Sequence, residues 1–297
     1  MIKDIFTSFH PVVNLLYFTV VIGFSMFFMH PVTLAISLIC ASSYAIYLGG
    51  KKALRLGLIF MLPMLILTAA LNPLFNHQGA TILAYLPNGN PLTLESALYG
   101  IAASTMLITV IAWFSCVNAV ISSDKIVYLF GRVIPALSLI LAMSLRFVPR
   151  FREQIKVISN AQKCIGRDIS SGTILQKARH GIKILSMMLT WALENAIDTA
   201  DSMKARGYGL PGRTAFSNYR FDKRDTKVSV YILVCTAVIT FGAVSGVYHF
   251  RYFPTIRGEW TGIGTFTVFA AYLALGALPI IVNVREDLLW KLIESKT

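Results

Sequence analysis

Long, almost uncharged runs of apolar residues constrain this sequence more than any other feature. Six of them are candidates for membrane-crossing helices: Pro11–Met29, Val32–Leu48, Leu56–Leu71, Ser96–Val120, Val228–Phe250 and Thr261–Val282. A hydrocarbon layer ~30 Å thick needs about 20 apolar residues per crossing, and a helix satisfies its own backbone polar groups there. The second and third runs are short and need little tilt or a thin membrane. With 56% hydrophobic and 14% charged residues, the sequence predicts an all-α, polytopic membrane protein with about six membrane-spanning helices.

The charges concentrate in the middle of the chain. Residues 121–227 hold 18 of the 27 Lys and Arg and 8 of the 14 Asp and Glu, which gives +10 of the formal net charge of +13. Such a basic segment is typical of the cytoplasmic side of a membrane protein. We therefore expect three parts: N-terminal membrane helices in 1–120, a cytoplasmic region in 121–227, and C-terminal membrane helices with a tail in 228–297.

The loops between the runs indicate an orientation. Three basic residues, at positions 51, 52 and 55, join the second and third runs, whereas residues 72–95 contain no Lys or Arg. Because Lys and Arg favour the cytoplasmic side, the first loop is predicted inside and the second outside. Both termini and the basic middle then face the cytoplasm. Arg251 and Arg257 are the exception, since this order places them outside.

Two apolar segments in the middle, Ile126–Leu145 and Ile182–Leu193, are interrupted or too short to cross alone. Each runs into a charged amphipathic helix, and the two helices are joined by a short linker at residues 170–172. The apolar faces are expected to pack on each other, with the charged faces in water. The expected apolar residues are Phe151, Ile155, Ile158 and Ile165 in the first helix and Leu189, Leu193, Ala196, Ile197, Ala200 and Met203 in the second.

The second amphipathic helix ends in a distinctive sequence. Residues 204–212 read Lys-Ala-Arg-Gly-Tyr-Gly-Leu-Pro-Gly. The glycines can adopt left-handed conformations and Pro211 cannot continue a helix. The carbonyl end of the helix favours the positive charge of Arg206. The small Ala205 and Gly207 leave room for another surface to approach.

At these residues the sequence resembles the transmembrane T component of energy-coupling factor transporters. The matching residues are Leu-Glu-Asn-Ala at 193–196, the stretch 200–209 around Ala205-Arg206-Gly207, and Arg-Thr at 213–214. Upstream, Leu-Arg-Phe-Val-Pro at 145–149 and Ala-Gln-Lys at 161–163 resemble the approach to the family's first Ala-Arg-Gly motif. There the sequence departs from the pattern, because residues 164–166 read Cys-Ile-Gly. Lys163 or Arg167 could supply the missing cation.

The resemblance implies a non-catalytic subunit of an importer for vitamins or transition metals in a prokaryotic cell membrane. In this family two coupling helices dock onto two cytoplasmic ATP-binding-cassette ATPase subunits, and a separate small membrane subunit, the S subunit, binds the substrate. For this sequence the resemblance implies six coupling residues, which would contact the ATPase subunits: Lys163, Gly166, Arg167, Ala205, Arg206 and Gly207. Supporting residues on the helices are Arg146, Pro149, Glu194, Asp201 and Met203.

The sequence shows few features that would indicate another function. No Walker A pattern is present. The five histidines and four cysteines are scattered, so we predict no metal site, disulfide framework or cofactor. The first apolar run is interpreted as a retained helix rather than a signal peptide, and the basic patches as facing lipid headgroups rather than nucleic acid. The alternatives left open are a self-contained membrane transporter, a membrane-embedded enzyme with regulatory cytoplasmic helices, and an importer permease that binds substrate itself. Gly23, Gly57 and Gly100 are candidates for close helix contacts.

Overall fold

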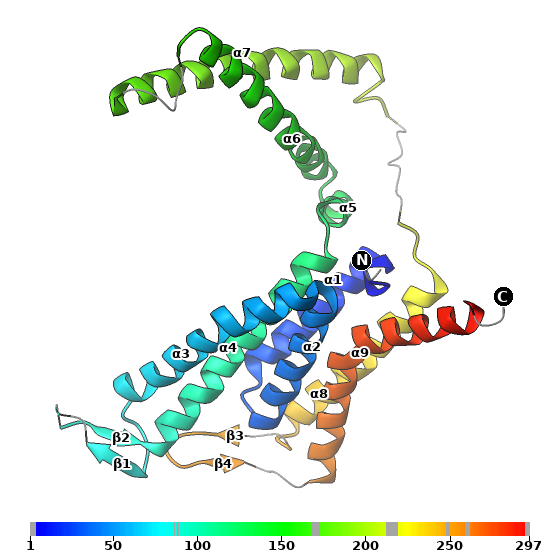
Figure 1. The fold of residues 1–297 in the computed structure, drawn as a ribbon. Helices are drawn as coiled ribbons and strands as arrows, with labels where there is room; N and C mark the ends of the chain where they lie inside the picture. The colour runs from blue at the N-terminus through cyan, green and yellow to red at the C-terminus, as the bar shows by residue number, and fades with distance from the viewer. Residues whose placement is uncertain are drawn as a thin grey trace. The chain divides into compact units, whose positions relative to one another are not determined.

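The computed structural model describes residues 4–85, 87, 89–167, 173–211, 219–247, 250–258 and 262–294. Helices dominate this part of the chain, as Figure 1 shows. The described residues divide into two compact units: unit 1 comprises Met1–Lys125 with Tyr219–Thr297, and unit 2 comprises Ile126–Asn218. The three-part division predicted from charge, at 120/121 and 227/228, concerns the membrane boundary and stays a prediction.

Unit 1 is a bundle of apolar helices. It contains the short 3-10 helix η1 (Phe6–Ser8), the π-helical turn η2 (Gly57–Met61) and the helices α1 (Pro11–Phe27), α2 (Pro31–Leu56), α3 (Leu62–Phe75), α4 (Leu94–Val120), α8 (Lys223–Val244) and α9 (Ile263–Glu294). Among the residues that the structure describes, four helices are long and apolar enough to cross a membrane: Pro31–Gly50, α4, α8 and α9. The first and third predicted spans form shorter apolar helices of 17 and 14 residues. The prediction of an all-α polytopic protein fits the fold, whereas its count of six spans is not confirmed.

Histidine and proline begin the first two helices of the bundle. The Nδ1 atom of His10 accepts a hydrogen bond from the amide of Val12 (3.3 Å), and that of His30 accepts one from the amide of Val32 (3.2 Å). In both cases the proline that follows the histidine occupies the first helical position, where its missing N–H costs nothing. These two of the scattered histidines therefore cap helices.

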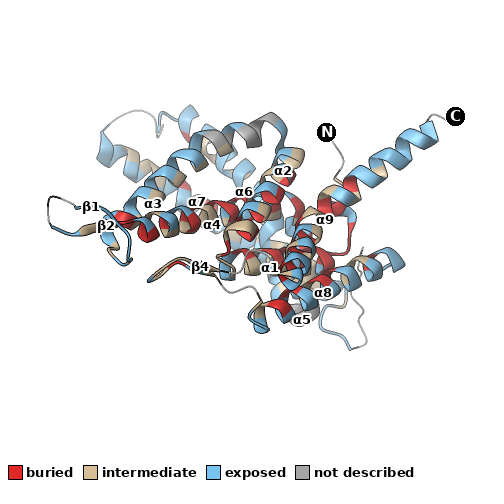
Figure 2. Cartoon of the chain, turned by 90° about the horizontal axis from the view of Figure 1, so that it is seen from below, coloured by how far each residue is buried: buried red, intermediate tan, exposed pale blue. Residues whose placement is uncertain are grey.

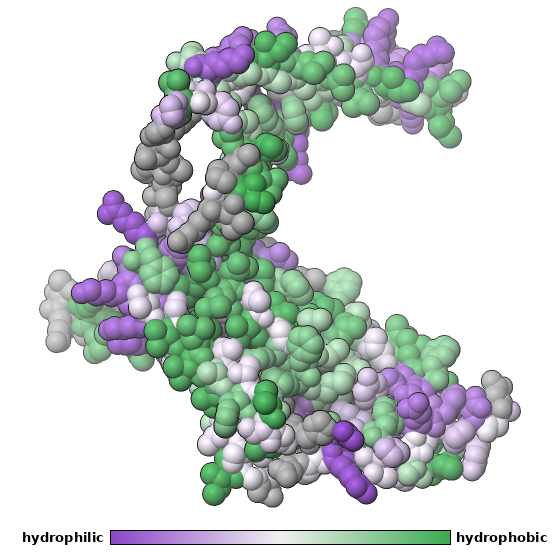
Figure 3. Space-filling view, turned by 180° about the vertical axis from the view of Figure 1, so that it is seen from behind, coloured by the Kyte–Doolittle hydropathy of each residue, from purple (hydrophilic) through white to green (hydrophobic). Residues whose placement is uncertain are grey.

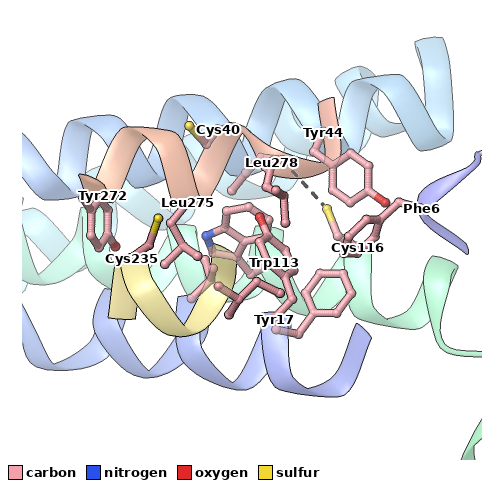
Figure 4. Close-up of a cluster of buried hydrophobic side chains, with 14 of the residues drawn as sticks. Phe6, Tyr17, Cys40, Tyr44, Trp113, Cys116, Cys235, Tyr272, Leu275 and Leu278 are labelled. Atoms are coloured by element: carbon pink, nitrogen blue, oxygen red, sulfur yellow. Dashed lines mark hydrogen bonds between the residues drawn. The ribbon is translucent and has the colours of Figure 1, made fainter. Parts of the chain in front are cut away.

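The core of unit 1 lies where α1, α2, α4, α8 and α9 meet, and Figure 2 shows the buried residues concentrated there. Trp113 is fully buried at its centre and donates its indole N–H to the hydroxyl of Ser37 (3.0 Å). Tyr17 packs edge-on against the Trp113 ring at 6.1 Å and donates its hydroxyl to the carbonyl of Gly276 (3.1 Å). Figure 4 shows these aromatic side chains converging from several helices. A satisfied aromatic cluster of this kind holds the bundle together without exposing polar atoms to lipid.

Large hydrophobic side chains cover much of the outside of unit 1 (Figure 3). Phe27, Phe75 and Phe241 are 84%, 81% and 76% exposed. Such a surface suits hydrocarbon rather than water.

Of the three candidate glycines for close helix contacts, one is confirmed. A Cβ on Gly100 would lie 2.7 Å from the carbonyl oxygen of Ala69 and 2.9 Å from the Cβ of Asn72, so α3 and α4 touch through their backbones there. Gly23 and Gly57 have no atom within 4 Å of an added Cβ. Those two glycines therefore make no close helix contact within the part of the chain that the structure describes.

Two short hairpins were not predicted from the sequence. Strand β1 (Ile82–Tyr85) pairs antiparallel with β2 (Pro91–Thr93), and Ile82 lies opposite Thr93. Strand β3 (Phe250–Arg251) pairs with β4 (Arg257–Gly258). The amide of Ala80 donates to the carbonyl of Pro254 (3.1 Å) and so joins the two loop regions. All four strands are too short to give a clear period in the sequence.

Unit 2 contains most of α5 (Ser123–Val133) and the two long helices α6 (Pro135–Cys164) and α7 (Ile174–Ala205). Each apolar segment runs into its amphipathic helix, as predicted, and the first segment is broken at Ile134, before Pro135 begins α6. The hydroxyl of Thr173 and the side chain of Gln176 form a capping box that begins α7.

Helices α6 and α7 cross each other (Figure 1) and pack through aromatic and sulfur-containing residues. Phe151 contacts Trp191 edge-on at 5.6 Å, and the Gln162 amide reaches the sulfur of Met187 (3.7 Å). Ile184 and Met188 are the buried apolar residues of α7.

The predicted packing face of α7 is wrong. Leu189, Leu193 and Ile197 of the expected stripe are 60–64% exposed in the chain. On α6, Ile155 and Ile165 are likewise 47% and 63% exposed. The physical reason is that a single crossing partner covers only one narrow stripe of a helix that is apolar around much of its circumference.

Candidate functional site

The C-terminal end of α7 carries the Ala-Arg-Gly motif in a defined turn. The amide of Gly207 donates to the carbonyl of Lys204 (2.9 Å), and the amide of Tyr208 donates to that of Met203 (3.0 Å). Gly207 has φ = +77°, in the left-handed region that favours glycine. These two hydrogen bonds and the left-handed glycine define a Schellman motif with Arg206 as the C-cap residue.

The end of α6 has the same construction. The amide of Gly166 donates to the carbonyl of Lys163 (3.0 Å), the amide of Arg167 donates to that of Gln162 (2.9 Å), and Gly166 has φ = +74°. Ile165 is the C-cap residue here. The two helix ends therefore correspond position by position, and Ile165 stands where α7 has Arg206.

This correspondence fixes where the neighbouring cations lie. Lys163 and Lys204 occupy the same position, two residues before the cap residue, and both are exposed. Arg167 follows the left-handed glycine, at the position that Tyr208 occupies in α7. Positive charge at these carbonyl ends is favoured by the helix dipole. Each end thus presents a cation to solvent, but only α7 presents arginine from the cap itself.

The predicted supporting residues are distributed along the helices. Arg146 and Pro149 are exposed in α6, several turns before its end. Glu194 and Asp201 are exposed on α7, and the carbonyl of Met203 takes part in the terminal turn. The six coupling residues gather at two helix ends, whereas four of the five supporting residues lie away from them.

Sequence reasoning missed a buried polar cluster in unit 1. Lys125, only 4% exposed, donates from Nζ to the carbonyls of Thr7 (2.6 Å) and Val120 (3.1 Å). Asp4 and Asn283 hydrogen-bond each other at 2.6 Å across almost the whole sequence. The available signal was an isolated asparagine, Asn14, within the first apolar run, and another, Asn283, directly after the last one. Within the described ranges, no three His, Cys, Asp or Glu side chains are grouped closely enough to hold a metal ion.

The fold and the paired helix ends define a helical membrane protein with a second helical unit, whose two long helices end in matching turns with a cation at each end. The sequence profile of a known family, CbiQ, described as cobalt transport protein, matches residues 7–216. The chain belongs to this family.

Relatives among curated proteins bear the name energy-coupling factor transporter transmembrane protein EcfT. The protein from Lactococcus lactis subsp. cremoris is 36% identical over 104 residues, which cover 35% of this chain and 39% of the relative. That from Streptococcus thermophilus is 35% identical over 142 residues, covering 48% and 53%, and that from Bacillus subtilis is 33% identical over 106 residues, covering 35% and 40%. The chain therefore matches about two fifths to one half of the length of these relatives. The resemblance to the transmembrane component of energy-coupling factor transporters is confirmed.

Proposed function

We propose that the chain is the non-catalytic coupling subunit of an ATP-driven importer for vitamins or transition-metal ions. The observation that carries this proposal is the duplicated Schellman turn at the ends of α6 and α7. Two matched helix ends on one chain suit two copies of one kind of partner. Two cytoplasmic ATP-binding-cassette ATPase subunits, one on each end, are that partner.

The exposed cap of α7 has the chemistry for docking. Arg206 is exposed, and its guanidinium is planar and always charged, so it can bond a carboxylate or two carbonyls in a bidentate manner. Ala205 is small and Gly207 has no side chain, so a groove on the partner can close around the arginine. The end of α6 docks more weakly, because Ile165 replaces the arginine and its cations start from other positions.

The membrane unit holds the substrate-binding S subunit in this proposal. Its apolar helices expose large side chains, among them Phe60 of η2 at 65% and Ile66 and Leu67 of α3 at 60% and 61%. Lipid and another membrane subunit both suit this surface. The positive-inside pattern places both termini and unit 2 on the cytoplasmic side of a prokaryotic cell membrane. ATP hydrolysis belongs to the ATPase partners.

Affinity purification of the tagged chain from mild detergent, followed by mass spectrometry, tests this function. We expect two cassette ATPases and a small apolar membrane protein to co-purify with the wild-type chain. Arg206→Ala should lose most of the ATPases, whereas Arg179→Ala, an arginine on α7 away from the caps, should keep them. Recovery of a folded chain alone, with transport or enzymatic activity of its own, would contradict the proposal and favour the self-contained transporter or enzyme.

A further inference from the structure

The N-terminal segment Asp4–His10 contacts the two places in unit 1 at which the chain passes to and from unit 2. At Lys125 the chain leaves unit 1, and at Tyr219 it returns to it. Residues of this segment contact both places. We call it the N-terminal clasp.

The clasp binds the first connection, where the chain passes from α4 of unit 1 into unit 2, through the side chain of Lys125. This side chain donates from Nζ to the carbonyl of Thr7 in the clasp (2.6 Å) and to that of Val120, the last residue of α4 (3.1 Å). The Asn14 amide, oriented to satisfy its neighbours, donates to the carbonyl of Phe6 (3.1 Å) and accepts from Lys125 (2.7 Å). Three oxygens thus surround one buried ammonium group.

The clasp also binds the second connection, where the chain returns from unit 2 to unit 1 at the start of α8. The carboxylate of Asp225 accepts from the amide of His10 in the clasp (3.1 Å) and from the amide of Asp222 (2.9 Å). Arg224 donates to the hydroxyl of Ser8 (3.0 Å) and lies 4.3 Å from the centre of the Phe9 ring. These contacts are 215 and 216 residues apart in sequence.

The clasp is itself fixed to two further helices. The Asp4 carboxylate accepts from the Asn283 amide in α9 (2.6 Å) and from the Tyr44 hydroxyl in α2 (3.1 Å). The amide of Ile5 donates to the oxygen of Asn283 (2.8 Å). The clasp therefore connects the end of α4, the start of α8 and the flanking helices α2 and α9.

We propose that the clasp makes the two connections to unit 2 move as one, with Lys125 and Arg224 as its positioning residues. Moving either connection alone would break the hydrogen bond between the clasp and the buried side chain of Lys125 or Asp225, and losing a hydrogen bond to a buried charged group costs free energy. This inference rests on the proposed coupling function: a pull on unit 2 would then reach α4 and α8 together rather than bending one connection.

Hydrogen exchange of the full chain in lipid nanodiscs tests the clasp without any partner. Lys125→Met should raise exchange at least tenfold at the far connection, at the amides of His10 and Asp222. Arg224→Ala, which changes an exposed contact and should fold normally, should raise exchange at least tenfold in the peptide 117–126. The same Lys-to-Met change at the exposed Lys183 of α7 is the control and should alter neither. If each substitution changed hydrogen exchange only at the connection that contains it, the proposal would be overturned.

Exchange in the complex with its co-purified ATPases tests the transmission of movement. ATP with orthovanadate should change exchange in α4 and α8 of the wild type, and Arg224→Ala should reduce this change at least threefold while the ATPases stay bound. An undiminished response with the ATPases bound would overturn the clasp. If instead no ATPases accompany the wild-type chain, the proposed coupling function fails, and the reciprocal exchange of the isolated chain decides on the clasp alone.

Discussion

Ile165 and Arg206 occupy the same position in two matching helix caps. Each is followed by a glycine in the left-handed region, Gly166 at φ = +74° and Gly207 at φ = +77°. Both caps are closed by the same pair of backbone hydrogen bonds. The local backbone is thus duplicated while the side chain at the cap is not, and the two ends should differ in their affinity for a partner.

Removing the arginine should weaken docking strongly. Arg206→Ala is expected to cost about 2 to 4 kcal/mol of ATPase binding if the guanidinium is buried at the interface. Arg167→Ala should cost less, because this side chain leaves the cap from a different position. Titration of the purified chain in nanodiscs with the ATPase subunits measures both. Equal and negligible effects of the two changes would refute the coupling role of the helix ends.

Adding an arginine at the first cap should strengthen docking. Ile165→Arg gives α6 the side chain of α7 at a position that is 63% exposed, so the fold should tolerate it. We expect the affinity for the ATPases to rise about tenfold, equivalent to ~1.4 kcal/mol. The control is Ile174→Arg, at a position 88% exposed at the start of α7, which adds the same charge away from the caps. An equal gain from both would indicate general electrostatic attraction instead.

The cap glycine should be needed for its backbone conformation. Gly207→Ala places a side chain at φ = +77° and should cost about 1 to 2 kcal/mol locally. Its Cβ would also lie 3.1 Å from Leu210. We expect faster exchange of the Tyr208 amide and weaker ATPase binding. Gly181→Ala, within α7 and in open space, should leave both unchanged or make the helix slightly more stable; indistinguishable behaviour of the two variants would argue against the Schellman turn.

Close packing of α3 on α4 should depend on Gly100. Gly100→Ala forces a methyl group against the Ala69 carbonyl oxygen, which lies 2.7 Å from the added Cβ. Backbone atoms cannot rotate away, so we expect a loss of about 1 to 3 kcal/mol, seen as a lower melting temperature in detergent. Gly23→Ala meets nothing within 4 Å and serves as the matched control. No difference between the two would show that α3 can shift freely.

Lys125 should make stability depend on pH in alkaline conditions. Burial lowers its pKa to about 8, an effect that the nearby Asp4 opposes. The unfolded chain keeps this proton up to about pH 10. Between pH 8 and pH 10 the unfolded state therefore binds more protons, and stability rises with pH. The melting temperature of the wild type relative to Lys125→Met should increase over this range and stay constant below it. A decrease, or no change, would contradict the burial of the ammonium.

Much of the fold was predictable because it depends on local chemistry. Apolar runs of sufficient length predicted the long helices, and Gly207, Gly209 and Pro211 predicted where α7 stops. The departure at Ile165 was visible in the sequence as well, although the position-by-position match of the two caps needed the backbone.

The remainder depends on contacts between distant residues. Asp4 and Asn283 are 279 positions apart, and no sequence period connects them. The packing face of α7 was mistaken because an apolar helix surface does not show which of its stripes a partner covers. In both cases the sequence failed to show which residues or helix faces contact each other, although the local structure of each was predictable.

Photo-crosslinking from the helix ends tests the central claim most directly. A benzoylphenylalanine replacing Tyr208 after the cap of α7, or Arg167 after that of α6, should form adducts with the cassette ATPases in membranes. The same probe at Leu175, exposed at the start of α7, should form far fewer. Adducts from both ends would support docking of the two caps on the ATPases. Adducts from neither end, or equal adducts from the control position, would contradict it.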